Sequence, residues 1–445
     1  MKHIRLLSLL LILTFSVQAQ ELMTLDQARQ MALENDHDLK IAEQTTQRQE
    51  LLKKVAETYY LPSISAQGGA LYQSNDISET ADLSIPMPEG LPIKNIQASL
   101  PIDVSFNGAY MAGIQVNQAI YAGGKVRSSN KMAELGVEIA GENQKMQQVN
   151  TVVKTDQAYW TYVAVQSKVK LAQKNFSMLE SVVKQVKDSY DVGYSNQNDL
   201  LKIQVKYNKA KLDLQKAKNG LELTRMSLCQ IIGIDLDTPV KTDTNLVVEP
   251  DVLAELGEED VANRPEYQIL QKQVDLAESK IKNTRANYLP QLGVSASYGA
   301  WGGVDINSMN LSTSGFSAAA MLKIPIFNWG KGSKEIKSAK LEQQMKNEEL
   351  LKNTQLMQLE LTKARFALKE AAMTIDMCKT NVQQAKENRR MSADNYELGR
   401  ESITNLLIAQ TQWQEAENEL IEAKINFKLS ETDYLRTSAQ LIIEH

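Results

Sequence analysis

Two proline-free segments, 124–190 and 331–396, constrain the fold of this chain more than any other feature. As continuous helices they would each be roughly 100 Å long, at a rise of ~1.5 Å per residue. In the first segment, apolar side chains recur at every seventh position, at Val169, Phe176, Val183 and Tyr190. A seven-residue repeat held over this length predicts long helices that pack side by side as left-handed coiled coils.

The chain contains the same order of sequence motifs twice. The segment that ends in the tripeptide Tyr-Leu-Pro at Pro62 aligns without a gap with a segment that ends in the same tripeptide at Pro290, at a shift of 228 positions. Further on, "SYDVGYSNQNDLL" from Ser189 is similar to "NYELGRESITNLL" from Asn395, at a shift of 206. The chain is therefore predicted to contain two structural repeats, and the first has about twenty additional residues after Tyr72.

Each repeat is predicted to contain a helix, two strands, a long helix and a further helix. The first repeat, 20–232, has a helix from Asp36 to Tyr60, strands 61–75 and 106–122, and helices 124–190 and 198–232. The second repeat, 263–445, has a helix from Arg264 to Tyr288, strands 290–301 and 315–328, and helices 331–396 and 402–441. In both repeats the two shorter helices together match the long one, which predicts that they lie end to end beside it.

The connections between these elements differ in composition. Residues 74–107 are rich in proline and polar side chains, which predicts an exposed loop. The segment 233–262 between the repeats is predicted to be a linker, with a short helix from Pro250 to Leu256.

The strands alternate between small apolar and polar side chains, as at Leu292, Val294 and Ala296. Such alternation is typical of a barrel wall with lipid on one side and water on the other. It is equally typical of a sandwich strand with one face on a protein core. Aromatic residues near the strand ends are open to two interpretations as well, an interfacial girdle or packing at helix–strand junctions: Tyr59, Tyr60, Tyr121, Tyr288, Trp301, Phe327 and Trp329.

The N-terminal residues 1–19 have the pattern of a cleaved secretory signal, with Lys2 and Arg5 before a short apolar run. Cysteine is absent just after the expected cleavage point, so lipid attachment there has no acceptor. The formal net charge of −5 becomes −7 without the signal, which argues against a nucleic-acid partner. Cys229 and Cys378 lie within helical pattern and are predicted to be small buried hydrophobes.

The sequence offers little to a catalytic interpretation. Its three histidines, His3, His37 and His445, are far apart, and no His, Cys and carboxylate grouping has the spacing of metal ligands. We therefore expect neither an enzyme nor a bound metal or cofactor.

In this order and in two copies, the motifs resemble those of TolC-like outer membrane efflux proteins over essentially the whole mature chain. The residues that carry the resemblance are "NRPEYQIL" at the start of the second repeat, the two Tyr-Leu-Pro tripeptides, "PIFNWGKG" from Pro325 and the two repeated phrases. The resemblance implies an α+β membrane protein of the Gram-negative outer membrane, with most of its mass in the periplasm. Three protomers would form a twelve-stranded β-barrel, four strands from each, continued by a coiled-coil helical barrel.

The resemblance also implies partners and a functional region. The partners would be two further copies of the chain, a periplasmic adaptor protein, an inner-membrane transporter of the RND or ABC type, and outer-membrane lipid. The two repeated phrases would form the periplasmic tips, with adaptor contacts at Val192, Gly193, Leu398 and Gly399. The glycines are predicted to cap the preceding helices.

An aperture would lie next to the tips, formed by Asp199, Tyr396, Glu401, Asn405 and Ile408. In better known members, acids of the second repeat ring the aperture, whereas this chain has Asn405 and Ile408 there, and Glu401 in place of a basic residue. A ring of carboxylates is therefore not assumed.

The leading hypothesis is an exit duct for the efflux of drugs and other small molecules. The alternatives are a type I protein secretion duct and, less favoured, a soluble periplasmic coiled-coil scaffold.

Overall fold

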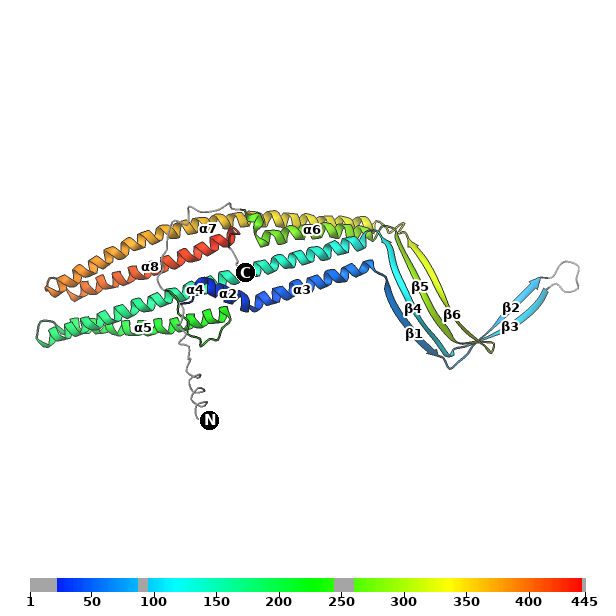
Figure 1. Cartoon of the computed structure of the whole chain (residues 1–445), viewed down its shortest axis with the longest axis horizontal. Helices are drawn as coiled ribbons and strands as arrows, with labels where there is room; N and C mark the ends of the chain where they lie inside the picture. Colours follow the sequence, from blue (N-terminus) through cyan, green and yellow to red (C-terminus); the bar gives the residue numbers. More distant parts are fainter. Residues whose placement is uncertain (1–21, 87–94, 244–259, 442–445) are drawn as a thin grey trace, which may run out of the picture. The chain divides into compact units, whose positions relative to one another are not determined.

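The computed structural model describes residues 22–86, 95–243 and 260–441, and these divide into two compact units (Figure 1). The predicted signal and the predicted helix from Pro250 to Leu256 lie outside the described residues. The first unit contains residues up to 47 together with 139–271 and 349 onward. The second unit contains 48–138 and 272–348.

The two longest predicted helices are continuous. They are α4, Lys125–Asp191, and α7, Lys331–Glu397, each of 67 residues. The shorter predicted helices correspond to α3, His37–Glu57; α5, Gln197–Ile232; α6, Pro265–Ala286; and α8, Ile403–Thr437. One helix was not predicted, α2, Leu25–Asn35, which begins with a capping box between Thr24 and Gln27. Among the described residues, every helix is too short or too polar to cross a membrane.

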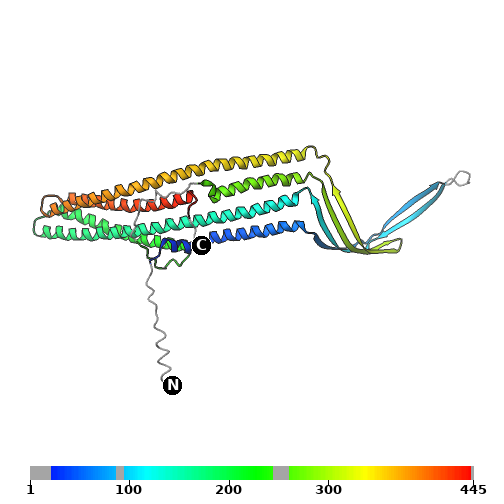
Figure 2. The same ribbon diagram turned by 45° about the horizontal axis from the view of Figure 1, so that its top comes forward.

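In the first unit, α4 and α5 run side by side and form one hairpin, and α7 and α8 form another (Figure 2). Rows at the seven-residue spacing are partly buried on α4, where Val169, Phe176 and Val183 are half-buried and Tyr190 is 39% exposed, and they are largely buried on α8. On α8 they include Leu406, Trp413 and Phe427, with the alanines Ala409, Ala416 and Ala423 between them. Large side chains on one row and small ones on the other allow the helices to approach closely.

Within this unit, polar contacts join the ends of the shorter helices to the long ones. Where α2 and α5 end, the Asn35 side chain donates a hydrogen bond of 3.1 Å to the Ile232 carbonyl, and the adjacent Asp36 carboxylate accepts a hydrogen bond from the Thr151 hydroxyl of α4. At the end of α8, Glu360 of α7 accepts from Arg436 at 2.7 Å and from Arg264 at 2.9 Å. Burial alone would raise the pKa of the Glu360 carboxyl, but the two guanidinium groups hold it below its ordinary value. Each short-helix end is thus fixed beside a continuous helix.

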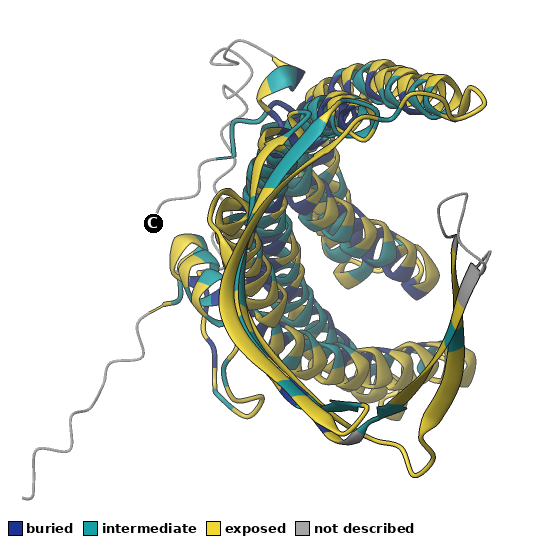
Figure 3. Ribbon diagram, turned by 90° about the vertical axis from the view of Figure 1, so that its right-hand side faces the viewer, coloured by how far each residue is buried: buried dark blue, intermediate teal, exposed yellow. Residues whose placement is uncertain are grey.

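The second unit carries a six-stranded antiparallel sheet whose four main strands are β1, Ser63–Tyr72; β4, Asn107–Ala122; β5, Gln291–Ile306; and β6, Met309–Lys323. The contact between β4 and β5 joins the two repeats. The sheet is curved, and most of its residues are exposed (Figure 3). All residues of β1 and nearly all of β6 are exposed, including Ile64, Phe316 and Met321. A sandwich would bury one face of these strands, so the sandwich alternative is wrong.

The prediction of an exposed loop over 74–107 is wrong as well. Most of this segment forms an antiparallel hairpin of β2, Ile77–Pro86, and β3, Asn95–Ser105. Apolar residues alternate along β3, at Ile96, Ala98, Leu100, Ile102 and Val104. This alternation indicates a strand, whereas the prolines of the segment indicate a loop. Prolines are tolerated here because Pro86 ends its strand and Pro101 lies in a narrow two-stranded ribbon, where an N–H can be absent without loss of a ladder bond.

Candidate functional site: the hairpin tips and the groove between α5 and α8

The two repeated phrases form the turns at the ends of the α4–α5 and α7–α8 hairpins. In the first turn, Gly193 has φ of 84°, and the Tyr194 amide donates to the Ser189 carbonyl at 2.8 Å. In the second, Gly399 has φ of 68°, and the Arg400 amide donates to the Asn395 carbonyl at 2.8 Å. Both are Schellman motifs, which end a helix with a residue of positive φ. The predicted glycine caps are therefore confirmed.

Side-chain caps start the next helix in each hairpin. The Asn196 side chain accepts from the Asp199 amide at 2.8 Å at the start of α5. Ser402 accepts from the Asn405 amide at 3.4 Å at the start of α8. Asp199 and Asn405 therefore occupy equivalent positions, the third of their helices, which is why the sequence repeat aligns them.

The four residues predicted to contact an adaptor lie at the outer surface of these turns. Val192 and Leu398 are 68% and 65% exposed, and both glycines are exposed as well. Leaving two aliphatic side chains in water at the very end of two hairpins gives no folding stability, so their position is suited to contact with another surface.

Beneath the turns, all four helices contribute to one apolar core, which we call the tip core. Its buried members are Leu179, Val186, Ile203, Ala210, Ile403, Leu406 and Leu407. Tyr396 is half-buried against this core. Burial, together with the negative charge of Asp199, raises the pKa of the Tyr396 hydroxyl, so the phenol stays protonated at neutral pH.

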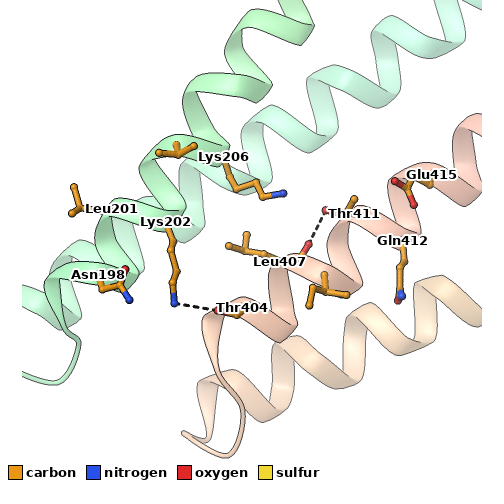
Figure 4. Close-up of a pocket in the computed structure, with 11 residues that line it drawn as sticks. Asn198, Leu201, Lys202, Lys206, Thr404, Leu407, Thr411, Gln412 and Glu415 are labelled. Atoms are coloured by element: carbon orange, nitrogen blue, oxygen red, sulfur yellow. Dashed lines mark hydrogen bonds between the residues drawn. The ribbon is translucent and has the colours of Figure 1, made fainter.

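A groove of about 760 Å³ lies between α5 and α8 on the surface of the tip (Figure 4). Its walls are apolar at Leu201, Val205, Leu407 and Ile408, and polar residues line it at Asn198, Lys202, Lys206, Thr404, Thr411, Gln412 and Glu415. Five pairs of lining residues are related by the shift of 206 positions found in the sequence: Asn198 with Thr404, Leu201 with Leu407, Lys202 with Ile408, Val205 with Thr411, and Lys206 with Gln412. The two hairpins thus present equivalent faces to one groove.

Lys202 connects the two hairpins across this groove. Its ammonium group donates to the Thr404 hydroxyl of α8 at 3.3 Å and lies 3.4 Å from the Asp199 carboxylate (Figure 4 shows the first contact). The Asp199 carboxylate also accepts from the Asn196 side chain at 3.0 Å. One acid therefore supports a lysine that bridges to the second repeat.

The structure brings only some of the predicted aperture residues together. Asp199 is near Tyr396 and, through Lys202, connects to Thr404. Ile408 lines the groove and is 51% exposed, whereas Glu401 and Asn405 do not line it. Lys202 is not among the aperture residues predicted from the sequence. The repeat nevertheless points to it, because Lys202 occupies in the first repeat the position that Ile408 occupies in the second. The groove therefore combines apolar and basic side chains.

A buried polar layer crosses the helices farther from the turns. The Gln410 amide of α8 donates to the Asn175 side chain of α4 at 2.8 Å, and both residues are buried. The Arg389 guanidinium of α7 lies 4.7 Å from the centroid of the Trp413 ring. Within the described residues, Gln410 Oε1 and Trp413 Nε1 are buried without a hydrogen-bond partner. Incompletely paired polar groups lower the cost of separating these helices.

The described residues contain no group of three or more His, Cys, Asp or Glu side chains placed to hold a metal ion. Both cysteines are buried, and burial raises the pKa of each thiol, which disfavours the reactive thiolate.

Comparison with known proteins decides the family. The sequence profile described as "outer membrane efflux protein" matches residues 28–234 and 256–433. The chain belongs to this family. The four main strands of the sheet, both tips and all but the last residues of α8 in the two helical hairpins lie within the matched segments.

Relatives with assigned roles include both efflux and secretion proteins. The chain is 22% identical to the outer membrane efflux protein BepC of Brucella suis over 63% of its own length and 60% of that protein. It is 22% identical to the toluene efflux pump outer membrane protein TtgC of Pseudomonas putida, over 92% of this chain and 81% of TtgC. It is 21% identical to the alkaline protease secretion protein AprF of Pseudomonas aeruginosa, over 65% of this chain and 61% of AprF.

Solved structures share the fold. CusC, whose structures are described in connection with transmembrane channel formation, matches with a TM-score of 0.77 at 16% identity, over 95% of this chain and 93% of that one. VceC of Vibrio cholerae matches with a TM-score of 0.73 at 12% identity, over 93% and 95%. The fold is therefore the mixed helical and β fold of these outer membrane channels.

The hydrogen bond from Lys202 to Thr404 is expected to help hold the groove closed. Lys202→Met keeps an apolar stem and removes the charge, so we expect larger single-channel conductance in a planar bilayer and greater entry of bulky antibiotics into cells. The matched control is Lys206→Met, which removes an equal charge from the same groove. No described residue of α8 accepts a hydrogen bond from Lys206, so this variant is expected to conduct like the wild type. Equal conductance for both variants and the wild type would show that the bridge does not contribute to closure.

Proposed function

We propose that this protein is a passive exit duct of the Gram-negative outer membrane, through which small molecules are exported. The observation that carries this function is the family match, which spans most of the chain and both hairpin tips. Relatives named for toluene efflux and for antibiotic efflux support small molecules as the cargo. The energy for export would come from an inner-membrane pump of the RND or ABC type, connected through a periplasmic adaptor.

The sheet supports placement in the membrane. Its strands expose large apolar side chains, among them Ile64, Phe316 and Leu322, at 71%, 72% and 60%. Exposed apolar strands of this kind are costly in water and favourable in lipid. This observation disfavours the alternative of a soluble periplasmic scaffold.

The edges of the sheet support a trimer. Among the described residues, β1 pairs only with β4, and β6 pairs only with β5, so each has one edge without a partner strand. Free backbone groups are not tolerated in the hydrocarbon layer of a membrane. Three copies, each contributing β1, β4, β5 and β6, would close a twelve-stranded barrel and remove every edge.

The helices of the first unit support the same assembly. On α7, the apolar residues Leu359, Phe366 and Met373 follow the seven-residue spacing and are 66%, 63% and 61% exposed. On α5, Leu212 is 54% exposed, whereas Val205, one heptad before it, lines the groove next to α8. Apolar side chains are therefore exposed on both hairpins, and pairing α7 of one copy with α5 of the next would close a ring.

Within this duct, the tips would contact the adaptor through Val192, Gly193, Leu398 and Gly399. The aperture would be closed by Asp199, Tyr396 and Asn405, by apolar packing near Ile408, and by the Lys202 bridge, with Glu401 at its border. A type I protein secretion duct is the second candidate function, and the similarity to AprF favours keeping it.

Deletion of the gene distinguishes an efflux duct from a protein secretion duct. If the protein is an efflux duct, the deletion strain becomes several-fold more sensitive to a panel of antibiotics, dyes and solvents, and the wild-type gene restores resistance. The secreted proteins of both strains are compared in the same cultures. Unchanged susceptibility together with the loss of a secreted protein would favour the secretion duct over the efflux duct.

The trimer is tested at Phe366. Phe366→Glu places a charge on the exposed apolar row of α7, and burying an unpaired charge at an interface is strongly unfavourable. We therefore expect the detergent-solubilised protein to shift from trimer to monomer in light scattering coupled to size-exclusion chromatography. Phe366→Leu, which keeps the row apolar, is expected to remain trimeric. A Phe366→Glu protein that remains trimeric would show that this apolar row of α7 is not part of the interface between copies.

A further inference from the structure

The segment that connects β6 to α7, residues 324–330, exposes an unusual amount of apolar surface. Ile326 is 93% exposed, Phe327 is 69% exposed and Trp329 is 86% exposed. The rings of Phe327 and Trp329 contact each other edge to face, with their centroids 5.0 Å apart. This contact keeps the two rings together without burying them in the protomer.

The backbone of Trp329 has a strained conformation. Its φ is 51°, in the left-handed region that bulky residues rarely adopt. Strain of this kind normally persists where surrounding contacts compensate for it. Here the Lys331 amide donates a hydrogen bond of 2.9 Å to the Asn328 carbonyl and closes a turn across Trp329 and Gly330, which leaves the indole exposed.

The same region is strongly basic. Five lysines occur between the end of β6 and the first turns of α7, at Lys323, Lys331, Lys334, Lys337 and Lys340, and Glu335 is the only acid among them. The Glu335 carboxylate accepts a hydrogen bond from the Tyr288 hydroxyl and lies 3.8 Å from the Lys331 ammonium. Among the described residues, no carboxylate lies within ion-pair distance of Lys334, Lys337 or Lys340.

The corresponding connection in the first repeat is different. After β4, the Lys125 ammonium donates to the Asn287 side chain at 3.0 Å, and the Lys131 ammonium lies 2.8 Å from the Glu134 carboxylate. Those basic groups already have protein partners. The β6–α7 connection thus combines three lysines without an ion-pair partner with exposed aromatic rings, whereas after β4 the exposed Arg127 is the single basic side chain without a partner among the described residues of the first turns of α4.

A cavity of about 730 Å³ joins these features. The residues that line it include Tyr288, Ile326, Phe327, Lys331, Lys337 and Lys340 (Figure 1 shows where β6 meets α7). Its volume is in the range of pockets that hold small ligands. Apolar side chains line one part of it and ammonium groups another, which suits a ligand with an anionic head and a hydrocarbon tail.

From this arrangement we infer that the β6–α7 connection is a binding site for an anionic phospholipid. Lys331, Lys337 and Lys340 line the part of the site that receives the anionic headgroup. Ile326 and Phe327 lie against the first part of the acyl chains, with the Trp329 ring in contact with Phe327. Continuity with β6 places the site where a membrane-embedded sheet would leave the lipid, the depth at which headgroups lie and where basic clusters recruit anionic lipid. The inference rests on the proposed placement of the sheet in the membrane.

The experiment uses the full-length protein in vesicles of phosphatidylethanolamine that contain a minor fraction of phosphatidylglycerol. In one preparation the phosphatidylglycerol is brominated, and in the other an equal fraction of phosphatidylethanolamine is brominated instead. Bromine quenches nearby indoles, so the difference between the wild type and Trp329→Phe isolates the signal of Trp329. Flotation in a density gradient first establishes that the protein is in the vesicles.

We expect brominated phosphatidylglycerol to quench Trp329 about twofold or more over brominated phosphatidylethanolamine, because each nearby lysine favours an anionic lipid. The triple variant Lys331→Gln, Lys337→Gln and Lys340→Gln loses this preference but still shows quenching of Trp329. The control triple variant Lys352→Gln, Lys363→Gln and Lys369→Gln removes equal charge from exposed positions of the same helix and keeps the preference.

Equal quenching by the two lipids in a protein that floats with the vesicles would overturn the site and leave the exit duct intact. Loss of the preference in the control variant would overturn it too, because net charge alone would then be responsible. A protein that fails to float with the vesicles would overturn the membrane placement, and the lipid site with it.

Discussion

The close packing of long helices through a seven-residue repeat is the interaction on which the rest of the structure depends. It requires α4 and α7 to stay continuous over 67 residues each, so that buried rows remain in register from one end of the hairpin to the other. Because the shorter helices are fixed beside these continuous ones by polar contacts such as Arg264 and Arg436 with Glu360, the two hairpins end in closely matched turns. The tips, the tip core and the groove all follow from this register.

Duplication explains why the two hairpins present equivalent faces to one groove. The same short phrase folds into the same Schellman turn twice, and the two copies meet through residues at equivalent positions. Where the copies differ, the chemistry differs: Asp199 corresponds to Asn405, and Lys202 corresponds to Ile408. The acid and the base therefore come from one repeat, and the apolar side chain and the Thr404 acceptor come from the other.

Much of this fold could be predicted from the sequence because its signals are local and periodic. Heptads locate the helices to within a few residues, and the glycine after each repeated phrase locates the caps. The β2–β3 hairpin was missed because prolines such as Pro101 normally exclude a strand, and the alternation along β3 is the competing signal. Helix α2 is short and lacks a heptad partner, so only its capping box marks it. The repeat relates Lys202 to Ile408, but the bridge from Lys202 to Thr404 could not be predicted, since it depends on how closely α5 and α8 approach.

We propose that the passage through the tip closes where α5 meets α8. It is tested most directly by joining these helices with a short reducible thiol reagent in a variant carrying Lys202→Cys and Thr404→Cys, both native cysteines being buried. We expect the linked protein in a planar bilayer to be held in a low-conductance state under voltage, and reduction to restore the openings of the unlinked variant. Full openings in the linked protein would contradict the claim.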